Sequence, residues 1–322
     1  MKATEVWSEA TVEALRALTP TVREFTLRPS GGALPAAPGS HLPVQLPVRG
    51  RAQTRCYSLI GPPQDGCYRI AVKRLDGGRG GSLAMWELAA GQRLAVGEPQ
   101  NHFPLDLGAP AHLLVAGGIG VTPLVWMAQA LAARGAVVHM LYGDRSRHEL
   151  AYFDTLQAAL GDRLQARLSG QGERIAFGPA IAALPPGGRL VVCGPAPMLD
   201  AARQAWSAAG RAPADLRFET FGAGPAAEPF RVRVPRHAVE ITVPADCSLL
   251  DALERAGVQT LSDCRRGECG LCAVDVLAVD GRIDHRDVFL GPAEKAANRR
   301  LCACVSRAVG TLTLDSAFRS DR

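Results

Sequence analysis

The stretch 263–272, "DCRRGECGLC", carries three cysteines at the spacing Cys264-x4-Cys269-x2-Cys272, and 29 residues separate the last of them from Cys302. Two glycines inside the stretch allow the backbone to turn tightly. A loop of this kind must wrap around whatever its thiols bind. It therefore decides the fold of the C-terminal part of the chain.

This spacing is that of plant-type [2Fe–2S] sites, in which a C-x4-C-x2-C loop is completed by a distant cysteine. Zinc sites usually pair two short C-x2-4-C segments instead. Here the second segment is Leu301-Cys302-Ala303-Cys304, with only one residue between its cysteines. The spacing therefore favours an iron–sulfur cluster, and a zinc-stabilised binding module is kept as an alternative of a different class.

The fourth ligand position has two candidates, Cys302 and Cys304. Residues two apart in an extended segment point to the same side, so local geometry does not separate them.

The bulk composition is that of a globular protein with several packed cores. The chain has 322 residues, 47% hydrophobic and 21% charged, with a formal net charge of +5 and nine cysteines. Its length predicts two domains or three small ones. The positive charges form no stripe with interleaved aromatic residues, so no nucleic-acid partner is expected.

The chain shows neither an N-terminal signal peptide nor an uninterrupted apolar run of about 18 residues that could span a membrane. We therefore expect no membrane association and a cytoplasmic location. Thiols stay reduced there, and clustered cysteines more often bind metal than form disulfides.

Three regions differ in pattern, which predicts a multidomain protein. Residues 1–108 alternate short apolar strands with turns, which predicts an antiparallel β-barrel. Residues 109–224 alternate strands with helical segments, which predicts an α/β domain with a doubly wound parallel sheet. After a linker at 221–230, residues 229–322 begin with a predicted hairpin and a helix that Ser248 caps.

Two turns of the α/β region predict a nucleotide site. In "VAGGIGVTPL", Gly117, Gly118 and Gly120 directly follow an apolar strand, Thr122 is expected to cap the next helix, and Pro123 suits its first turn. Backbone N–H groups and a helix N-terminus would then face a pyrophosphate.

The second turn, Cys193-Gly194-Pro195, also joins a strand to a helix. It is therefore expected at the same carboxyl edge of the parallel sheet, where such folds bind their ligands.

The barrel region contains Arg55-x-Tyr57-Ser58 and the glycine-rich segment 77–82, "GGRGGS". An arginine suits a phosphate, a tyrosine can pack on an apolar ring, and a serine can donate to a ring nitrogen. The N–H groups of the glycine-rich turn and the Ser82 hydroxyl could cradle a phosphate. Taken alone, the pattern is equally compatible with an ordinary half-buried strand.

Taken together, these segments resemble a known family. R-x-Y-S followed by G-G-x-G-x-T-P and C-G-P resembles the ferredoxin–NADP reductase superfamily. The C-terminal plant-type ferredoxin, with G-R-G-G-S and "NHFPL" in the barrel, is similar to the phthalate dioxygenase reductase branch, to which vanillate O-demethylase reductases belong. The resemblance covers nearly the whole chain.

The resemblance implies an FMN-binding barrel at 1–108, an NADH-binding domain at 109–224 and a β-grasp ferredoxin domain at 229–322. It implies an oxidoreductase that passes electrons from NADH through FMN and the [2Fe–2S] cluster to a separate Rieske-type oxygenase or O-demethylase of aromatic compounds. A flavin is expected between the other two because it accepts a hydride and releases single electrons. A haem protein is the alternative acceptor.

By the same resemblance, residues are assigned to three sites. The residues expected to bind the FMN phosphate are Arg55, Gly80, Gly81 and Ser82. Those expected to contact the flavin ring are Tyr57, Ser58, Ala71, Val72, Lys73 and Phe221. The residues expected to bind the dinucleotide are Gly117, Gly118, Gly120, Thr122, Asp144, Cys193, Gly194 and Pro195. The expected cluster ligands are Cys264, Cys269, Cys272 and Cys302, and Cys304 is expected to lie beneath the cluster.

Hydride transfer is expected near Ser58 and Cys193, without a side chain acting as acid or base. Asp144 suits a ribose hydroxyl and favours NADH, whereas Arg145 and Arg147 could bind the 2′-phosphate of NADPH. We further expect Arg265, Arg266 and Glu268 at the surface, where they would meet the partner.

Overall fold

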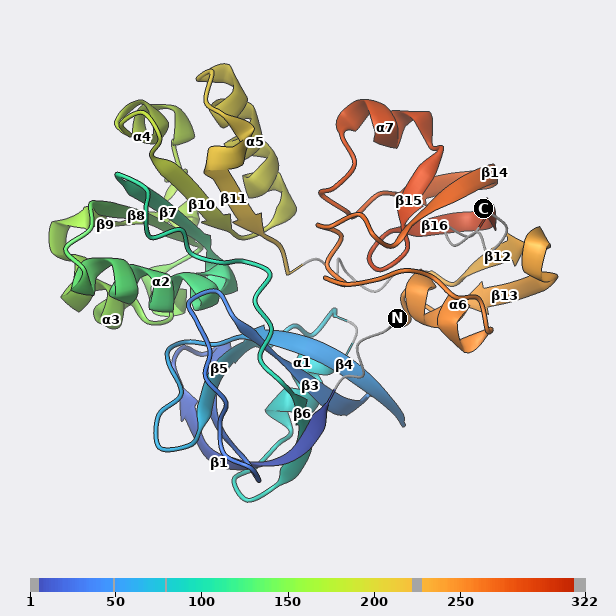
Figure 1. The fold of residues 1–322 in the computed structure, drawn as a ribbon, viewed down its shortest axis with the longest axis horizontal. Coiled ribbons are helices and arrows are strands. Elements are labelled where there is room, and N and C mark those ends of the chain that lie inside the picture. The colour runs from blue at the N-terminus through green and yellow to red at the C-terminus, as the bar shows by residue number, and fades with distance from the viewer. Residues whose placement is uncertain (1–5, 49, 79, 222–227, 316–322) are drawn as a thin grey trace. The chain divides into compact units, whose positions relative to one another are not determined.

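The structure, a computed structural model, describes residues 6–48, 50–78, 80–221 and 228–315. The chain divides into two compact units (Figure 1), one of residues 1–75 and 81–219 and the other of residues 76–80 and 220–322. The linker predicted at 221–230 and the domain boundary at residue 224 fall largely on residues 222–227, outside the described residues.

The first unit begins with a six-stranded antiparallel sheet that curls on itself (Figure 1), with the strand order β4-β3-β6-β1-β2-β5. Its elements are β1 (Trp7–Ala17), β2 (Val22–Pro29), β3 (His41–Val48), β4 (Arg51–Ser58), β5 (Tyr68–Lys73), α1 (Gly81–Trp86) and β6 (Arg93–Gly97). Phe25, Leu42 and Ile70 fill its interior without solvent exposure. A backbone bridge between Leu59 and Ile70 brings the two outer strands together, as a barrel requires.

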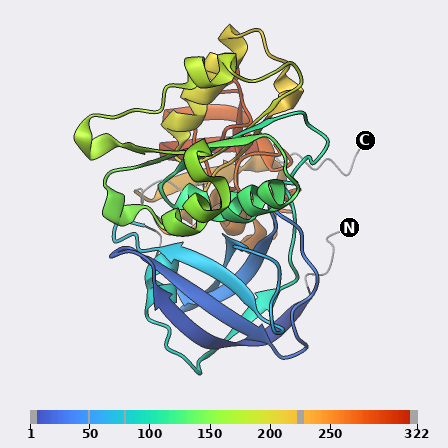
Figure 2. The same ribbon diagram turned by 90° about the vertical axis from the view of Figure 1, so that its left-hand side faces the viewer.

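A five-stranded parallel sheet completes the first unit, with the order β11-β10-β7-β8-β9. Its strands are β7 (His112–Gly117), β8 (Val138–Asp144), β9 (Leu164–Leu168), β10 (Arg189–Cys193) and β11 (Leu216–Glu219). Its helices are α2 (Val121–Ala133), α3 (Phe153–Leu160), α4 (Phe177–Ala182) and α5 (Ala196–Ala208). Figures 1 and 2 show α2 and α3 on one face of the sheet and α4 and α5 on the other.

Short 3₁₀ helices connect these elements at η1 (Gly118–Gly120), η2 (Arg147–Glu149), η3 (Gly161–Arg163), η4 (Ser169–Gln171) and η5 (Pro213–Asp215). From β7 the chain proceeds outward in one direction through β8 and β9, and from β10 in the other direction to β11. The order of the strands therefore reverses between β7 and β10. Open α/β sheets bind their ligands at this switch point.

The second unit is built on a mixed five-stranded sheet with the order β13-β12-β16-β14-β15. Its elements are β12 (Phe230–Val234), η6 (Pro235–His237), β13 (Val239–Val243), α6 (Leu249–Arg255), β14 (Ala273–Asp284), α7 (Pro292–Ala297), β15 (Arg300–Cys302) and β16 (Arg307–Asp315). Among the described strands of this second sheet, only β12 and β16 pair in parallel. Val232, Leu250 and Leu312 belong to one buried core.

The predicted hairpin of β12 and β13 and the predicted cap of α6 are both confirmed. The Ser248 hydroxyl accepts a hydrogen bond from the Asp251 backbone N–H at 3.0 Å. None of the helices in the described residues combines the length and the apolar character that a membrane crossing needs.

Candidate functional site

The end of β4 presents a buried hydroxyl. Ser58 is 4% exposed, and its Oγ has no hydrogen-bond partner among the described residues. A buried hydroxyl without a partner costs about 1–3 kcal/mol, so a bound molecule with a polar atom at this point would relieve that cost. In the residue before it, removal from water raises the pKa of Tyr57 and keeps its phenol neutral. Both side chains suit a flavin, whose ring is apolar with polar nitrogens.

Arg55 lies against the start of α1, and its role on a phosphate stays a prediction. A Cβ on Gly81 would lie 2.6 Å from Arg55 Nε, so glycine leaves room for the guanidinium. The Arg55 guanidinium donates to the Thr54 carbonyl at 2.8 Å, and the Ser82 hydroxyl accepts from the Leu75 N–H at 3.2 Å. Gly80, also predicted here, belongs to the second unit, and its role stays a prediction.

Of residues 71–73, which are predicted to line the edge of the flavin, the first two are buried and Lys73 is partly exposed. Ala71 and Val72 are 4% and 3% exposed, and the Val72 carbonyl accepts from Trp86 Nε1 at 3.1 Å. Lys73 instead reaches across to the α/β domain, with its Nζ 3.8 Å from Asp144 Oδ2 and 3.7 Å from Glu149 Oε2. The side chain that can face a ligand in this segment is therefore Lys73.

The two predicted nucleotide turns meet at the switch point of the parallel sheet. A Cβ on Gly120 would lie 2.2 Å from the Cys193 carbonyl oxygen, and one on Gly194 would lie 3.2 Å from Gly117 Cα. Met198, which no sequence motif indicated, packs its side chain against both Gly117 and Gly194. This contact between the turns leaves backbone at the carboxyl edge of β7 and β10, as a pyrophosphate site requires.

Thr122 does not cap α2 as expected. The helix starts at Val121 after Gly120, and the Thr122 hydroxyl donates to the Ile119 carbonyl at 3.0 Å. The reason is the preceding 3₁₀ turn of Gly118–Gly120, which moves the helix start ahead of the threonine. Pro123 does lie in the first turn, as predicted.

Asp144 ends β8 beside the first glycine turn. Its Oδ2 would lie 3.6 Å from a Cβ on Gly118, and its Oδ1 accepts from the Arg145 N–H at 2.6 Å. Burial raises the pKa of this carboxyl, although the Arg145 N–H and Lys73 act in the opposite direction. Of the two competing arginines, Arg147 stacks its guanidinium over the Phe153 ring at 4.6 Å. These positions favour a ribose hydroxyl over a 2′-phosphate.

The cysteine loop brings Cys264 and Cys269 together. Their thiols are hydrogen-bonded to each other, and Cys264 Sγ accepts the backbone N–H groups of Arg266 and Cys269, both at 3.4 Å. The loop passes through positive φ at Gly267, where a Cβ would lie 2.5 Å from Val305 Cγ2. Backbone N–H groups that point at a ligand sulfur fit the thiolates of an iron–sulfur cluster.

A second group consists of Cys272, Cys302 and Cys304. Cys272 Sγ lies 3.1 Å from Cys304 Sγ, and the Cys302 thiol also bonds to it. Donation by Cys302 and Cys304 lowers the pKa of Cys272 to about 3, and the bond to Cys272 together with burial raises the pKa of the other two. The structure thus brings Cys304 as close to the site as the predicted ligand Cys302.

The described residues contain no three His, Cys, Asp or Glu side chains that converge closely enough to hold a single metal ion. The thiols form two sets, the loop pair and the second group, and the charge of Cys264 still raises the pKa of Cys302 and Cys304. Two irons, each with its own pair of thiolates, suit such a distribution.

The charged residues expected to meet the partner are largely occupied within the second unit. Arg266 is only 8% exposed, contrary to the expectation of a surface position. Glu268 accepts from the Thr220 N–H at 2.5 Å, and Arg265 pairs with Asp251 at 2.9 Å and Glu254 at 3.1 Å. Phe221, predicted to cover the flavin, is 39% exposed and its role stays a prediction.

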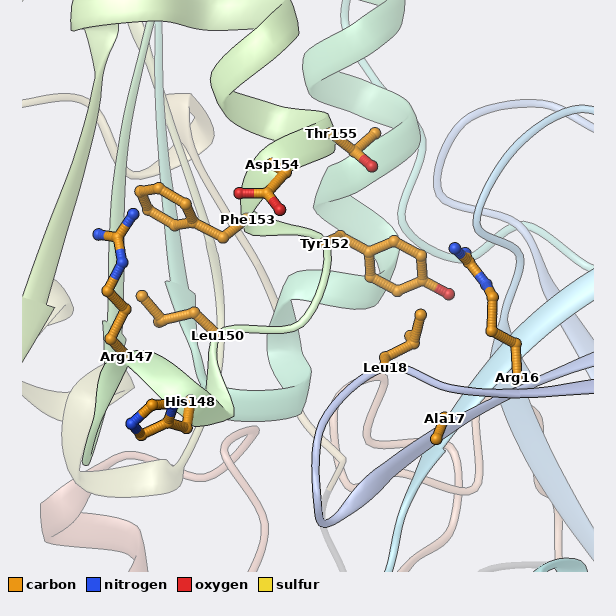
Figure 3. Close-up of a pocket in the computed structure, with 10 residues that line it drawn as sticks. All are labelled: Arg16, Ala17, Leu18, Arg147, His148, Leu150, Tyr152, Phe153, Asp154 and Thr155. Atoms are coloured by element: carbon orange, nitrogen blue, oxygen red, sulfur yellow. The ribbon is translucent and has the colours of Figure 1, made fainter.

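A cavity of about 490 Å³ lies elsewhere in the first unit, between the end of β1 and the start of α3 (Figure 3). It is lined by Arg16, Ala17, Leu18, Arg147, His148, Leu150, Tyr152, Phe153, Asp154 and Thr155. Tyr152 and Arg16 both bond to the Glu24 carboxylate, at 2.6 Å and 3.0 Å. Of the residues weighed for the nucleotide site, the lining of this cavity contains Arg147, one of the two arginines considered for a 2′-phosphate.

Comparison with known proteins agrees with this arrangement. Residues 232–309 match the family described as 2Fe-2S iron-sulfur cluster binding domain, which leaves the zinc alternative without support. The chain is 39% identical over 303 residues to the heme-dependent oxidative N-demethylase beta subunit of Ectopseudomonas mendocina, covering 93% of this chain and 96% of that protein.

It is also 36% identical over 312 residues to a vanillate O-demethylase oxidoreductase of a Pseudomonas species, again covering 93% of this chain and 96% of the relative. Among solved structures, phthalate dioxygenase reductase is 31% identical with a TM-score of 0.79, over 96% of this chain and 98% of that one. That structure is described as modular, for electron transfer from pyridine nucleotides to [2Fe-2S]. By sequence, by fold and by the order of its parts, the chain belongs to the phthalate dioxygenase reductase family.

Proposed function

We propose that this protein is the NADH-dependent reductase component of an oxygenase system, with electrons passing from NADH through FMN and a [2Fe–2S] cluster to a separate oxygenase. One observation carries the proposal. The same chain contains both the switch-point turns and the cysteine loop, in the architecture of phthalate dioxygenase reductase. The proposed domains are 1–108, 109–224 and 229–322.

FMN supplies a centre that accepts a hydride and releases electrons singly, and the cluster supplies a one-electron carrier. The protein binds and orients these groups. Arg55 and the N–H groups at the start of α1 would hold the phosphate, and the Ser58 hydroxyl would donate to the ring beside the position of hydride transfer. The unpaired Ser58 Oγ is the main support for this orientation among the described residues.

The nicotinamide nucleotide would lie along the carboxyl ends of β7 and β10. The N–H groups of the two glycine turns would bind its pyrophosphate, and Asp144 would accept from a ribose hydroxyl. Cys193 and Gly194 would then lie beside the nicotinamide ring. No side chain needs to move a proton for hydride transfer, so the contribution of the protein is orientation.

The cluster would be held by Cys264, Cys269 and Cys272 with a fourth thiolate from the segment 302–304. The family resemblance favoured Cys302 for that position. The contact of 3.1 Å between the sulfurs of Cys272 and Cys304 leads us to propose Cys304.

For the acceptor we propose a Rieske-type oxygenase or O-demethylase of aromatic compounds, in the cytoplasm, where the cluster thiolates escape oxidation to disulfides. The support is the similarity to vanillate O-demethylase oxidoreductase and phthalate dioxygenase reductase. A haem-containing acceptor is the second candidate, because one relative at 39% identity is the beta subunit of a heme-dependent oxidative N-demethylase.

The test is the composition of the purified protein, followed by its acceptor preference. We expect released FMN rather than FAD, with about two iron atoms per chain, and NADH-driven turnover when a Rieske oxygenase is added. Turnover only with a haem protein would select the second candidate. A colourless protein with bound zinc would contradict the proposal altogether.

A further inference from the structure

We propose that Thr220 is a positioning residue for the cluster loop, 264–272. Through Glu268 and the Arg266 carbonyl, it holds the loop peptides whose N–H groups bond to the Cys264 sulfur. It thereby tunes the bound cluster from outside the cysteine motif. This inference rests on the proposed cluster site.

Thr220 makes three close polar contacts to the loop while it is itself only 5% exposed. Its backbone N–H donates to Glu268 Oε1 at 2.5 Å, and its hydroxyl oxygen lies 3.2 Å from both Glu268 Oε1 and the Arg266 carbonyl oxygen. Hydrogen bonds to a carboxylate are about twice as strong as those between neutral groups. Because water cannot easily replace them in a buried position, these contacts restrain the loop.

The other oxygen of the Glu268 carboxylate completes the restraint. Glu268 Oε2 lies 3.7 Å from Arg266 Nε, and the Arg266 side chain is 9% exposed. The carboxylate thus lies between Thr220 on one side and the guanidinium of its own loop on the other. Glu268 is thus hydrogen-bonded to Thr220 and attracted by the charge of Arg266.

The restrained residues neighbour the donors to the ligand sulfur. The N–H of Arg266 and the N–H of Cys269, directly after Glu268, both donate to Cys264 Sγ at 3.4 Å. Such donors stabilise the more negative, reduced form of a cluster and raise its reduction potential. A loop released from Thr220 would hold these donors less firmly, so the cluster would become harder to reduce.

The position of Thr220 in the chain gives the restraint a functional context. Thr220 follows Glu219, the last residue of β11, and precedes Phe221, the residue predicted to cover the flavin. Thr220 is therefore the first residue after β11, and its bonds to the cluster loop lie within the second unit.

The test compares Thr220→Val with Thr260→Val in the full-length holoprotein. Thr260 is 6% exposed, and its hydroxyl has no partner among the described residues, so its replacement removes an equally buried hydroxyl without removing a bond. The measurements are iron content, the electron paramagnetic resonance spectrum of the reduced cluster, and its potential from a titration followed by that spectrum.

We expect Thr220→Val to lower the equilibrium constant for cluster reduction by up to tenfold, which for one electron is about 59 mV, and to alter the spectrum. Thr220→Ser, which keeps the hydroxyl, should restore both, and Thr260→Val should leave both unchanged.

A Thr220→Val protein with full iron content, and with the spectrum and potential of Thr260→Val, would refute the positioning role while leaving the cluster site intact. If Thr220→Val fails to fold, Thr220→Ala decides, because it removes the same hydroxyl without changing a charge near the cluster, and an unchanged potential in that variant overturns the inference. A wild-type protein that binds no iron would instead overturn the proposed function.

Discussion

Ser58 offers a buried hydroxyl at the end of β4 that has no partner among the described residues. If FMN fills this position, Ser58→Ala should slow the reduction of the flavin by NADH about tenfold, the effect of losing a hydrogen bond of about 1.4 kcal/mol. Stopped-flow absorbance of the flavin measures this rate. The apoprotein should lose no stability, because an unpaired hydroxyl is removed.

Ser40→Ala is the matched control for stability. Ser40 is 3% exposed, and its hydroxyl accepts from the Ala37 N–H at 3.2 Å. Its removal should destabilise the apoprotein by about 1 kcal/mol without altering flavin reduction. Equal effects of the two variants on flavin reduction would contradict a specific role for Ser58.

The fourth cluster ligand is decided by exchanging one sulfur at a time. Cys304→Ser should lose most of its bound iron, whereas Cys302→Ser should keep it, because the Cys304 sulfur lies 3.1 Å from Cys272. Iron content and the visible spectrum after identical purification provide the comparison. Loss of iron in Cys302→Ser but not in Cys304→Ser would identify Cys302 as the fourth ligand, as the family resemblance favoured.

Asp144 gives the nucleotide site a dependence on pH. Burial raises its pKa above the ordinary value of 3.8, so the carboxylate is lost as the pH falls through that raised pKa. The bond to a ribose hydroxyl then loses its charge, and the dissociation constant of NADH should increase about tenfold at low pH, for about 1.4 kcal/mol. The Asp144→Asn variant should bind NADH weakly, without this dependence on pH. Equal pH profiles of NADH binding in the variant and the wild type would contradict a contact between Asp144 and the nucleotide.

At the scale of elements, the nucleotide site depends on the close approach of two turns. Gly120 adopts ordinary helical angles, but a Cβ there would lie 2.2 Å from the Cys193 carbonyl oxygen. Gly120→Ala should therefore destabilise the protein by about 1–3 kcal/mol and weaken NADH binding. Thermal unfolding and NADH titration measure both effects.

Gly178→Ala is the control for this substitution. Gly178 lies in α4, and a Cβ added there would meet no described atom within 4 Å. Because it is exposed and directly precedes Pro179, alanine should change the stability by no more than about 0.5 kcal/mol. A Gly120→Ala protein as stable as Gly178→Ala, with unchanged NADH affinity, would contradict the close approach.

The elements that follow a simple periodicity were predictable from the sequence, and those shaped by partners were not. The runs before Gly117 and Cys193 are buried on both faces in a parallel sheet, so they are uniformly apolar. The 12-residue strand β14 is largely exposed beyond its first residues and the six-residue helix α7 has no buried residue, so neither had a hydrophobic pattern to reveal it. Helix α2 starts before the predicted cap Thr122, because a 3₁₀ turn at Gly118–Gly120 precedes it and no hydrophobic pattern marks such a turn.

For the whole molecule, the sequence predicted three regions because each has its own pattern and its own motif. It did not predict the contacts that join distant segments. Lys73 with Asp144 and Thr220 with Glu268 connect residues of ordinary type without a local signature. Such contacts arise only when the folded backbone brings the segments together, so they required the structure.

The central claim is a linear path in which the flavin is reduced first and the cluster afterwards. Its most direct test is anaerobic stopped-flow mixing of NADH with the wild-type protein and with Cys272→Ser, followed at the flavin and cluster absorption bands. We predict that the variant, which loses one cluster thiolate, keeps the wild-type rate of flavin reduction and transfers no electrons to the oxygenase. A folded, FMN-loaded variant whose flavin is not reduced, or one that still drives the oxygenase at the wild-type rate, would contradict this path.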